Sequence, residues 1–302
     1  MRSSRTDVVL GCAATLSMGV PFLLIAVAQR AMSTPAMAAV RVVLAAATLM
    51  LVLARRPRGM LEEARAATTR HPVALSVVAL TAAVAPNLLI GAAERVVPTG
   101  TVSVMLSTTP LWIAVGAALT RSGERFGTQQ WIAAPLALVG VGWASRAATP
   151  SGAWLWCLLP LAAALSYAVA NLVMRRYLAD VPALIVTTAE MVVASAVLVP
   201  IAAAHPGQLR WQPAAWAAVA AAGIGCSGLG WLANTALVQR VGLSRASIVS
   251  YTSVVVSVLL GALILGEPLT GRVLSGTAIL VVAVVVFAWT RPLAIGSARM
   301  LR

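Results

Sequence analysis

The sequence predicts an all-α polytopic membrane protein whose ten transmembrane helices form two inverted five-helix repeats. Three observations support this fold class. The chain of 302 residues is 60% hydrophobic and 10% charged, whereas a soluble domain carries about 25% charged residues. Apolar runs of about twenty residues, the length that crosses a bilayer, recur along the whole chain. A segment near the C-terminus also repeats the pattern of an earlier one, which indicates two copies of one unit.

Each apolar run is expected to be a helix, because a bilayer core offers no water to backbone groups and the runs do not alternate as barrel strands do. The first run follows Arg2 and Arg5, as in a signal peptide. Its Leu16-Ser17 pair matches Leu165-Ser166 of the sixth run, so we retain it as a span. Loops are short, the longest being the Arg-rich residues 55–72, and no soluble domain fits anywhere. The predicted spans are residues 8–28, 35–54, 73–93, 100–120, 128–146, 154–174, 182–203, 213–238, 245–265 and 272–290.

The repeated segments are residues 93–126 and 237–270. Each begins with an acid or amide followed by arginine, continues through small residues and a polar mid-helix cluster, and ends in Gly-Glu. The marker pairs are Glu94-Arg95 with Gly123-Glu124, and Gln239-Arg240 with Gly266-Glu267. We therefore predict two domains, residues 1–147 and 148–302, with five spans each. Because five is odd, the second repeat enters the membrane upside down, as in many secondary transporters.

The net charge of +14 is explained by topology rather than by nucleic acid, since no basic groove with stacking aromatics is present. If the N-terminus is cytoplasmic, most of the 22 basic residues fall on the inner side. This predicts a multi-pass protein of the cytoplasmic (inner) membrane with both termini in the cytoplasm. The three cysteines fall in spans and the two histidines in loops, so we expect neither a metal site nor another cofactor.

The second copy of the repeated segment carries the most specific pattern. Small residues from Ser244 lead to a polar mid-helix, then to Gly266-Glu267, and Gly276 follows nine residues after Glu267. The first copy keeps Pro110 in mid-helix, whereas the second has Val254-Val255 at the position where a proline is common. In these features the chain resembles the EamA-type family of the drug/metabolite transporter superfamily, and the resemblance covers nearly the whole chain.

The resemblance implies a central cavity lined by the first, third, fourth, sixth, eighth and ninth spans. It also implies efflux by alternating access of a small metabolite or drug, an amino acid or a similar molecule. Two alternatives stay open, namely a non-transporting scaffold or channel and a membrane-embedded enzyme. The chain has no GxxxxGK[ST] loop for ATP-driven pumping, and its sparse acids and loop histidines favour a protein that is not an enzyme.

Polar and aromatic residues in mid-span are the candidates for binding a substrate. Pro110 frees a carbonyl that a ligand or hydroxyl can use, and Trp112 and Trp231 offer stacking faces. The alternative is structural, since Ser and Thr hold membrane helices together and Trp favours the interface. The candidates are Ser17, Asn87, Ser107, Thr108, Thr109, Pro110, Trp112, Ser166, Tyr167, Asn171, Trp231, Asn234, Ser250, Tyr251 and Ser253.

Glu190 is the most informative single residue. It lies eight residues after Pro182, roughly 12 Å from the inner helix end at 1.5 Å per residue, near the middle of a core about 30 Å thick. Acids at such depth face a cavity or a partner. We predict that Glu190 takes up a proton and couples export to proton influx. The alternative is a fixed structural partner of Arg41 or of nearby hydroxyls.

Four further residues carry charge. Arg41 either pairs with Glu190, binds an anionic group such as a substrate carboxylate, or snorkels to the outer interface. Glu94 ends the third span and is expected to be interfacial or to pair with Arg41. Glu124 and Glu267 are expected to cap or gate the helix that follows each of them.

The tenth span, Val273 to Trp289, is almost uniformly aliphatic. This favours a helix that faces lipid or forms a homodimer. Gly140 and Gly142 in the fifth span permit close packing, but not at the spacing of the common dimer motif. The expected partners are therefore the lipid bilayer, a small-molecule substrate, a proton or other ion, and a second copy of the chain.

Overall fold

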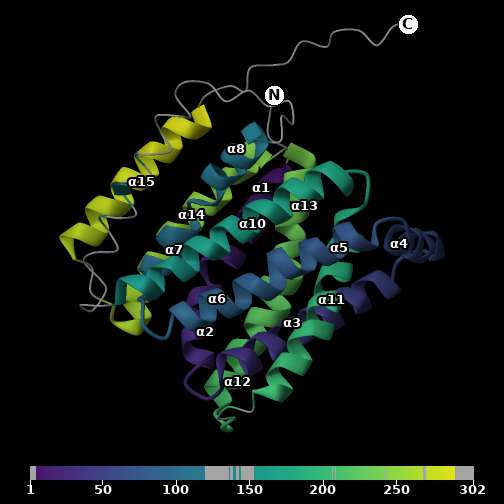
Figure 1. Cartoon of the computed structure of the whole chain (residues 1–302), viewed down its shortest axis with the longest axis horizontal. Coiled ribbons are helices and arrows are strands. Elements are labelled where there is room, and N and C mark those ends of the chain that lie inside the picture. The colour runs from purple at the N-terminus through teal and green to yellow at the C-terminus, as the bar shows by residue number, and fades with distance from the viewer. Residues whose placement is uncertain are drawn as a thin grey trace, which may run out of the picture.

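The computed structural model describes residues 5–119, 136, 139–140, 143, 153–205, 207, 209–241, 243–267 and 270–289. Every regular element in this part of the chain is a helix (Figure 1), and its only β pairing is an isolated antiparallel bridge between Met32 and Leu209. The all-α prediction is therefore confirmed for the described residues.

Seven helical stretches are long and apolar enough to cross a membrane, and they match the predicted spans one to four and six to eight. They are Thr6–Ala28, Thr34–Ala54, Pro72–Ala93, Thr99–Ala117, Leu155–Tyr177, Ala183–Ala204 and Pro213–Val241. The ninth and tenth predicted spans are helical as α14 (Leu243–Leu265) and α15 (Gly271–Trp289), but the apolar stretches within them are shorter. The fifth predicted span lies outside the described residues apart from residues 136, 139, 140 and 143. The count of ten spans and the domain boundaries therefore stay predictions.

Proline begins many of these helices, because its fixed φ suits the first turn and its missing N–H is not needed there. It occupies the first turn of α2, α3, α5, α6 and α12. The first half of the chain forms α1 (Arg5–Gly19), α2 (Pro21–Ala28), α3 (Thr34–Ala54), α4 (Arg58–Arg70), α5 (Pro72–Val78), η1 (Ala79–Val84), α6 (Ala85–Ala93), α7 (Thr99–Leu106) and α8 (Thr109–Leu119). The second half forms η2 (Ala153–Cys157), α10 (Leu158–Tyr177), α11 (Ala183–Ala204), α12 (Pro213–Ala220), η3 (Ala221–Gly230) and α13 (Trp231–Val241), followed by α14 and α15.

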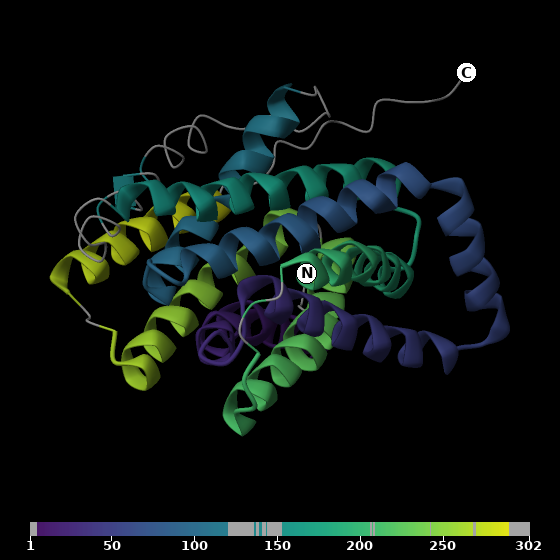
Figure 2. The ribbon, with the colours of Figure 1, turned by 60° about the horizontal axis from the view of Figure 1, so that its bottom comes forward.

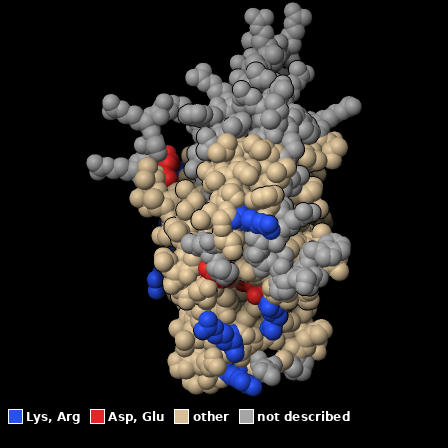
Figure 3. Space-filling model, turned by 90° about the vertical axis from the view of Figure 1, so that its left-hand side faces the viewer, with Lys and Arg blue, Asp and Glu red and all other residues tan. Residues whose placement is uncertain are grey.

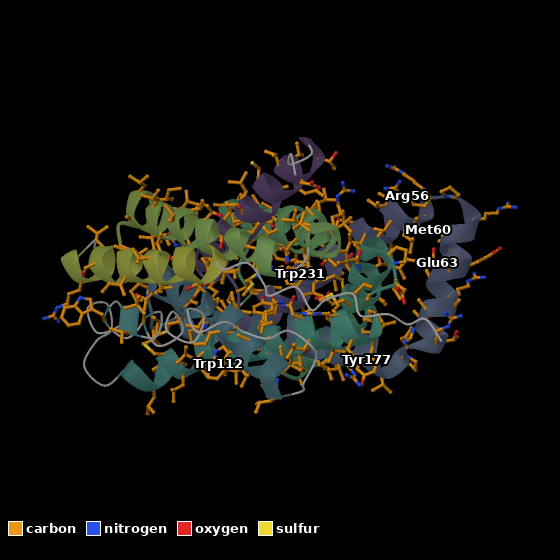
Figure 4. The ribbon with its side chains drawn as sticks, turned by 90° about the horizontal axis from the view of Figure 1, so that it is seen from above. Arg56, Met60, Glu63, Trp112, Tyr177 and Trp231 are labelled. Carbon is orange, nitrogen blue, oxygen red and sulfur yellow. The ribbon has the colours of Figure 1, made fainter. Side chains whose placement is uncertain are left out.

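The segment expected to be the longest loop, residues 55–72, contains the helix α4. Its buried Ala67 and half-buried Met60, Leu61 and Ala64 pack against the apolar cluster around Leu49. These four residues recur at helical spacing, so they form one apolar face on an otherwise polar helix. The apolar period is weak in the sequence because charged residues make up much of the segment. Figures 1 and 4 show α4 at one end of the bundle, with Arg56, Met60 and Glu63 labelled in Figure 4.

Several spans are not continuous α-helices. The third span runs through α5, η1 and α6, and the eighth through α12, η3 and α13, so each has a π-helical segment in its interior. The fourth span is divided into α7 and α8 at Ser107-Thr108. Such interruptions often mark functional positions inside helices.

Helices from the two halves of the chain interleave. α3 packs against α11 and η3, α1 against α13 and α14, α10 against α6 and α8, and α7 against α14. Figure 2 shows the purple first helices beside the green helices of the second half. Two buried apolar clusters contain residues of both halves, Phe22 with Val258 in one and Leu49 with Leu198 in the other. The two halves therefore share one core.

Polar contacts join the halves at both ends of the bundle, one between α1 and α13 and one between two loops. At one end, Arg240 Nε lies 3.0 Å from Asp7 Oδ1. At the other, the backbone N–H of Arg210 donates to the carbonyl of Ala31 over 2.7 Å, beside the Met32–Leu209 bridge.

α15 contacts α14 and α7 and exposes Leu274 and Val282. It lies on the side of the bundle that faces the viewer in Figure 3. Tan residues, which carry no charge, make up most of the described surface on that side. This exposure suits a helix against lipid or against a second copy.

Candidate functional site

A cavity of about 130 Å³ lies between helices of both halves of the chain. Figure 4 shows Trp231, one of its lining residues, near the middle of the bundle. Its polar and aromatic lining consists of Ser17, Phe22, Arg41, Asn87, Ser103, Ser107, Thr109, Tyr167, Asn171, Ser227, Trp231, Asn234 and Ser253. Its remaining lining consists of Met18, Pro21, Ile25, Ala82, Ile90, Leu106, Pro110, Ile113, Met191, Cys226, Val238 and Ala246. A concave, mostly apolar site with a few polar groups is typical of small-molecule binding.

Most of the residues selected from the sequence meet at this cavity. Those that line it are Ser17, Asn87, Ser107, Thr109, Pro110, Tyr167, Asn171, Trp231, Asn234 and Ser253, together with Arg41. They come from helices far apart in the chain, which the packing of the two halves brings together. Their role in binding stays a prediction.

Three selected residues lie away from the cavity, and two of them form hydrogen bonds inside the bundle. The hydroxyl of Thr108 donates to the carbonyl of Met105 over 2.7 Å. Ser166 donates over 2.7 Å to the carbonyl of Thr81 in η1. The buried Nε1 of Trp112 has no hydrogen-bond partner among the described residues. Thr108 and Ser166 satisfy backbone groups within the helices, which is the structural role considered for such residues. The side chains of Ser250 and Tyr251 lie outside the described residues.

Pro110 frees the carbonyl of Leu106, as expected from its missing N–H. The neighbouring hydroxyl of Thr109 donates to that carbonyl over 2.6 Å. The freed acceptor is therefore occupied by the chain itself. The break between α7 and α8 instead places Ser107, Thr109 and Pro110 on the cavity wall.

The cavity also has lining that the sequence did not indicate. Met191 brings the seventh span to the wall, although the expected lining did not include that span. Arg41 itself was selected from the sequence, but its span, the second, was not among those expected to line the cavity. Cys226 and Ser227 come from η3. The signal for η3 was the glycine-rich run within residues 221–230, because glycines in an apolar span permit close helix approach.

Arg41 is positioned by close packing between α3 and η3. A Cβ added to Gly223 would lie 2.7 Å from the carbonyl oxygen of Arg41 and 2.9 Å from Leu44 Cβ, so the two backbones approach where no side chain intervenes. Nε of Arg41 donates to Ser227 Oγ over 2.6 Å. Within the described part of the chain, Arg41 forms no ion pair with Glu190 or Glu94. The pairing of Arg41 with either acid therefore stays a prediction.

Glu190 lies behind the cavity wall rather than on it. The side chain is fully buried in α11, and its Oε2 accepts a hydrogen bond from Nε1 of Trp231 over 3.0 Å. Its Oε1 has no partner among the described residues. The Trp231 ring lies 5.9 Å from the Tyr167 ring, centroid to centroid, at 41°. The indole of Trp231 therefore connects Glu190 to the cavity by a hydrogen bond.

Glu94 is more buried than an interfacial residue. Both of its carboxylate oxygens are buried without a hydrogen-bond partner among the described residues. Its neighbour Arg95 is exposed and donates from Nε to Thr34 Oγ1 over 2.9 Å, which ties the end of α6 to the start of α3. Glu94 does not line the cavity.

Glu267 caps a helix of the other half rather than the helix that follows it. Its Oε1 accepts from the backbone N–H and the hydroxyl of Thr99, over 2.7 and 2.8 Å, and its Oε2 accepts from the N–H of Gly100 over 3.2 Å. Gly266, at φ +69°, turns the chain so that the N–H of Glu267 bonds to the carbonyl of Gly261 over 3.1 Å. The free N–H groups at the start of α7 attract the carboxylate. The expectation of capping the next helix was wrong, and Glu124 lies outside the described residues.

Replacing Glu267 by alanine should lower the stability of the protein by about 1–2 kcal/mol, because N–H groups of α7 lose their acceptor. Thermal unfolding of purified protein in detergent measures this as a lower midpoint. Glu267→Gln, which keeps one acceptor oxygen, should lie between alanine and wild type. Glu63→Ala, on the exposed face of α4, is the control. Equal midpoints for Glu267→Ala and Glu63→Ala would show that the cap adds no stability.

Comparison with known proteins agrees with this architecture. The model of the EamA-like transporter family matches residues 6–146 and 154–289. No curated protein matches the chain. A solved structure titled "Crystal structure of protein" is 19% identical, with a TM-score of 0.67, and the match covers 94% of this chain and 98% of that chain. At this identity the likeness is one of fold. Since the family model covers nearly the whole chain in two repeats, the chain belongs to the EamA-like transporter family and is a multi-pass membrane protein.

Proposed function

We propose that the chain is a secondary transporter that exports a small metabolite or drug across the cytoplasmic membrane by alternating access, with both termini in the cytoplasm. The observation that carries this proposal is the cavity. It lies between helices of both halves and is lined by amides, hydroxyls and aromatic rings as well as apolar side chains. A site between two repeats can open to either side when the halves rock against one another.

The interrupted spans supply places at which such rocking can occur. The breaks at η1, at η3 and between α7 and α8 lie in spans that contribute cavity lining. Each break replaces regular α-helical hydrogen bonds, so a small change of backbone there redirects the rest of the span. The two halves can then change their relative orientation, while each helical segment that carries wall residues keeps its internal structure.

The driving ion in this proposal is the proton, and Glu190 is its carrier. A charged carboxylate accepts a stronger hydrogen bond than a neutral carboxylic acid. Protonation of Glu190 therefore weakens its bond to Nε1 of Trp231. The indole, which lines the cavity, becomes freer to move. Proton binding and substrate binding are linked through this single side chain.

A bulky side chain in the cavity should strongly reduce transport. Asn234→Phe, which adds bulk to a lining residue, should reduce counterflow roughly tenfold or more, since overpacking a filled site costs about 1–3 kcal/mol. Val255→Phe is the matched control, because Val255 is exposed on α14. The measurement is counterflow of radiolabelled amino acids, nucleosides, lipophilic cations and carboxylates into proteoliposomes.

The same assay separates the alternatives. A carrier gives saturable counterflow, a channel gives flux without counterflow, and a scaffold gives neither. A membrane enzyme would release a chemically altered compound. Counterflow that Asn234→Phe and Val255→Phe affect equally would contradict the assignment of the cavity as the transport site.

A further inference from the structure

We infer that the Arg41–Ser227 end of the cavity binds the carboxylate of an apolar organic monoanion, which is the substrate class of the transporter. This inference rests on the proposed function for its transport consequence, but the binding itself is independent of transport. It starts from the charges on the cavity wall. Among the described lining residues, Arg41 is the single residue that carries a full charge.

The hydrogen bonding of Arg41 leaves its forked end available. Nε is held by Ser227 Oγ over 2.6 Å, and neither terminal nitrogen has a hydrogen-bond partner among the described residues. The two terminal nitrogens of a guanidinium match the two oxygens of a carboxylate in a planar, bidentate contact. Ser227 thus fixes the side chain in an orientation that presents this pair to the cavity.

The acids among the described residues form neither an ion pair nor a hydrogen bond with Arg41. Glu190 is fully buried and bonded to Trp231, and neither it nor Glu94 pairs with Arg41 or lines the cavity. A cation inside an apolar bundle is costly unless it has a counter-charge or water. A bound anion supplies the missing charge.

The rest of the wall fits an apolar body rather than a second charge. Phe22, Ile25, Ile113 and Met191 provide apolar surface, and the Tyr167–Trp231 pair provides aromatic surface. No carboxylate among the described lining residues faces the space to hold an ammonium group. The wall therefore favours an anion over a zwitterion or a cation of the same size.

The side-chain amides add a neutral polar contact. Nδ2 of Asn87 donates to the carbonyl of Ala83 over 2.7 Å, while its Oδ1 has no partner among the described residues. Nδ2 of Asn171 likewise donates within its own helix, to the carbonyl of Tyr167 over 2.8 Å. Such amides present oxygen to the cavity and suit a hydroxyl or N–H on the ligand.

The test uses four compounds that share a phenyl ring on a two-carbon chain and differ in charge. They are 3-phenylpropionate (anion), 3-phenylpropionamide (its neutral isostere), phenylalanine (zwitterion) and phenethylamine (cation). Binding to purified full-length protein is measured by isothermal titration calorimetry. The anion should bind most tightly. Arg41→Gln should weaken the anion roughly tenfold to a hundredfold, the size expected for charged hydrogen bonds, and leave the neutral amide unchanged.

Further variants separate charge recognition from folding. Arg41→Lys keeps the charge but lacks the fork, so its affinity for the anion should lie between that of wild type and Arg41→Gln. Arg30→Gln, which removes an exposed positive charge, should bind like wild type. Unchanged binding of the neutral amide to Arg41→Gln shows that the cavity is intact.

Several outcomes overturn the inference. They are tighter binding of phenylalanine or phenethylamine than of the anion, equal binding of the anion to wild type and Arg41→Gln, and binding of none of the four compounds. If Arg41→Gln still gives counterflow of a zwitterion or cation, the anionic substrate class is rejected and the transport function is kept. Arg41-dependent anion binding without any counterflow would retain the site and reject the transport function.

Discussion

Replacing Glu190 by glutamine should abolish the stimulation of transport by a pH gradient while leaving counterflow without a gradient close to wild type. The glutamine carbonyl can accept the hydrogen bond that Glu190 Oε2 accepts from Trp231 Nε1 over 3.0 Å, so the indole stays in place. Glutamine does not take up a proton, so the link between protonation and the cavity is lost. Uptake into proteoliposomes with and without an imposed pH gradient measures both properties.

Glu190→Leu is the companion to this variant, because it removes the acceptor altogether. The buried Trp231 N–H then lacks a partner, which costs about 1–3 kcal/mol, and transport should fall both with and without the gradient. Stimulation by the gradient that is equal in Glu190→Gln and wild type would reject the coupling role. Glu190 would then be a positioning residue for Trp231.

Replacing Gly223 by leucine should prevent accumulation of folded protein. The first atom of any side chain at Gly223 would lie 2.7 Å from the backbone oxygen of Arg41 and 2.9 Å from Leu44 Cβ. Since backbone cannot yield as a flexible side chain can, α3 and η3 must separate, at a cost of about 3 kcal/mol or more. The yield of monodisperse protein in detergent and its thermal midpoint measure the loss.

Gly225 is the matched control for this substitution. It lies two residues further along η3, and a Cβ there would meet no atom within 4 Å. Gly225→Leu should therefore give the yield and midpoint of wild type, and Gly223→Ala should lie between the two leucine variants. Equal behaviour of both leucine variants would show that the contact between α3 and η3 does not limit stability.

The spans were the most predictable part of the fold, because length and apolar composition decide whether a helix can cross a bilayer. Seven of them were found where the runs predicted. The interior of the spans was less predictable. Hydropathy does not distinguish α-helical from π-helical turns, so η1 and η3 left no trace in it. α4 was missed because its apolar face is narrow and its arginines dominated the segment.

Most of the polar cavity lining could be predicted from polar residues in the middle of the spans, whereas the hydrogen-bond partners of such residues could not. Depth in the membrane identified Glu190 as unusual, but its bond to Trp231 depends on how α11 packs against α13. Glu267 was recognised as a capping residue, yet the helix it caps begins at Thr99, far away in the chain. In both cases the residue type indicated a contact, and tertiary packing decided with which group.

The two π-helical segments have a consequence for how this protein can change over generations. η1 ends at Val84, just before Asn87, and η3 ends at Gly230, just before Asn234, and both amides line the cavity. A π turn holds an additional residue compared with an α turn, so each segment acts like a one-residue insertion. Loss of one codon in a regular α-helix rotates everything beyond it by about 100°, given 3.6 residues per turn. Loss of one codon within η3 would instead be absorbed as a change from a π turn to an α turn, so Asn234 and the rest of α13 would keep their orientation relative to α12 and the cavity wall would survive the deletion.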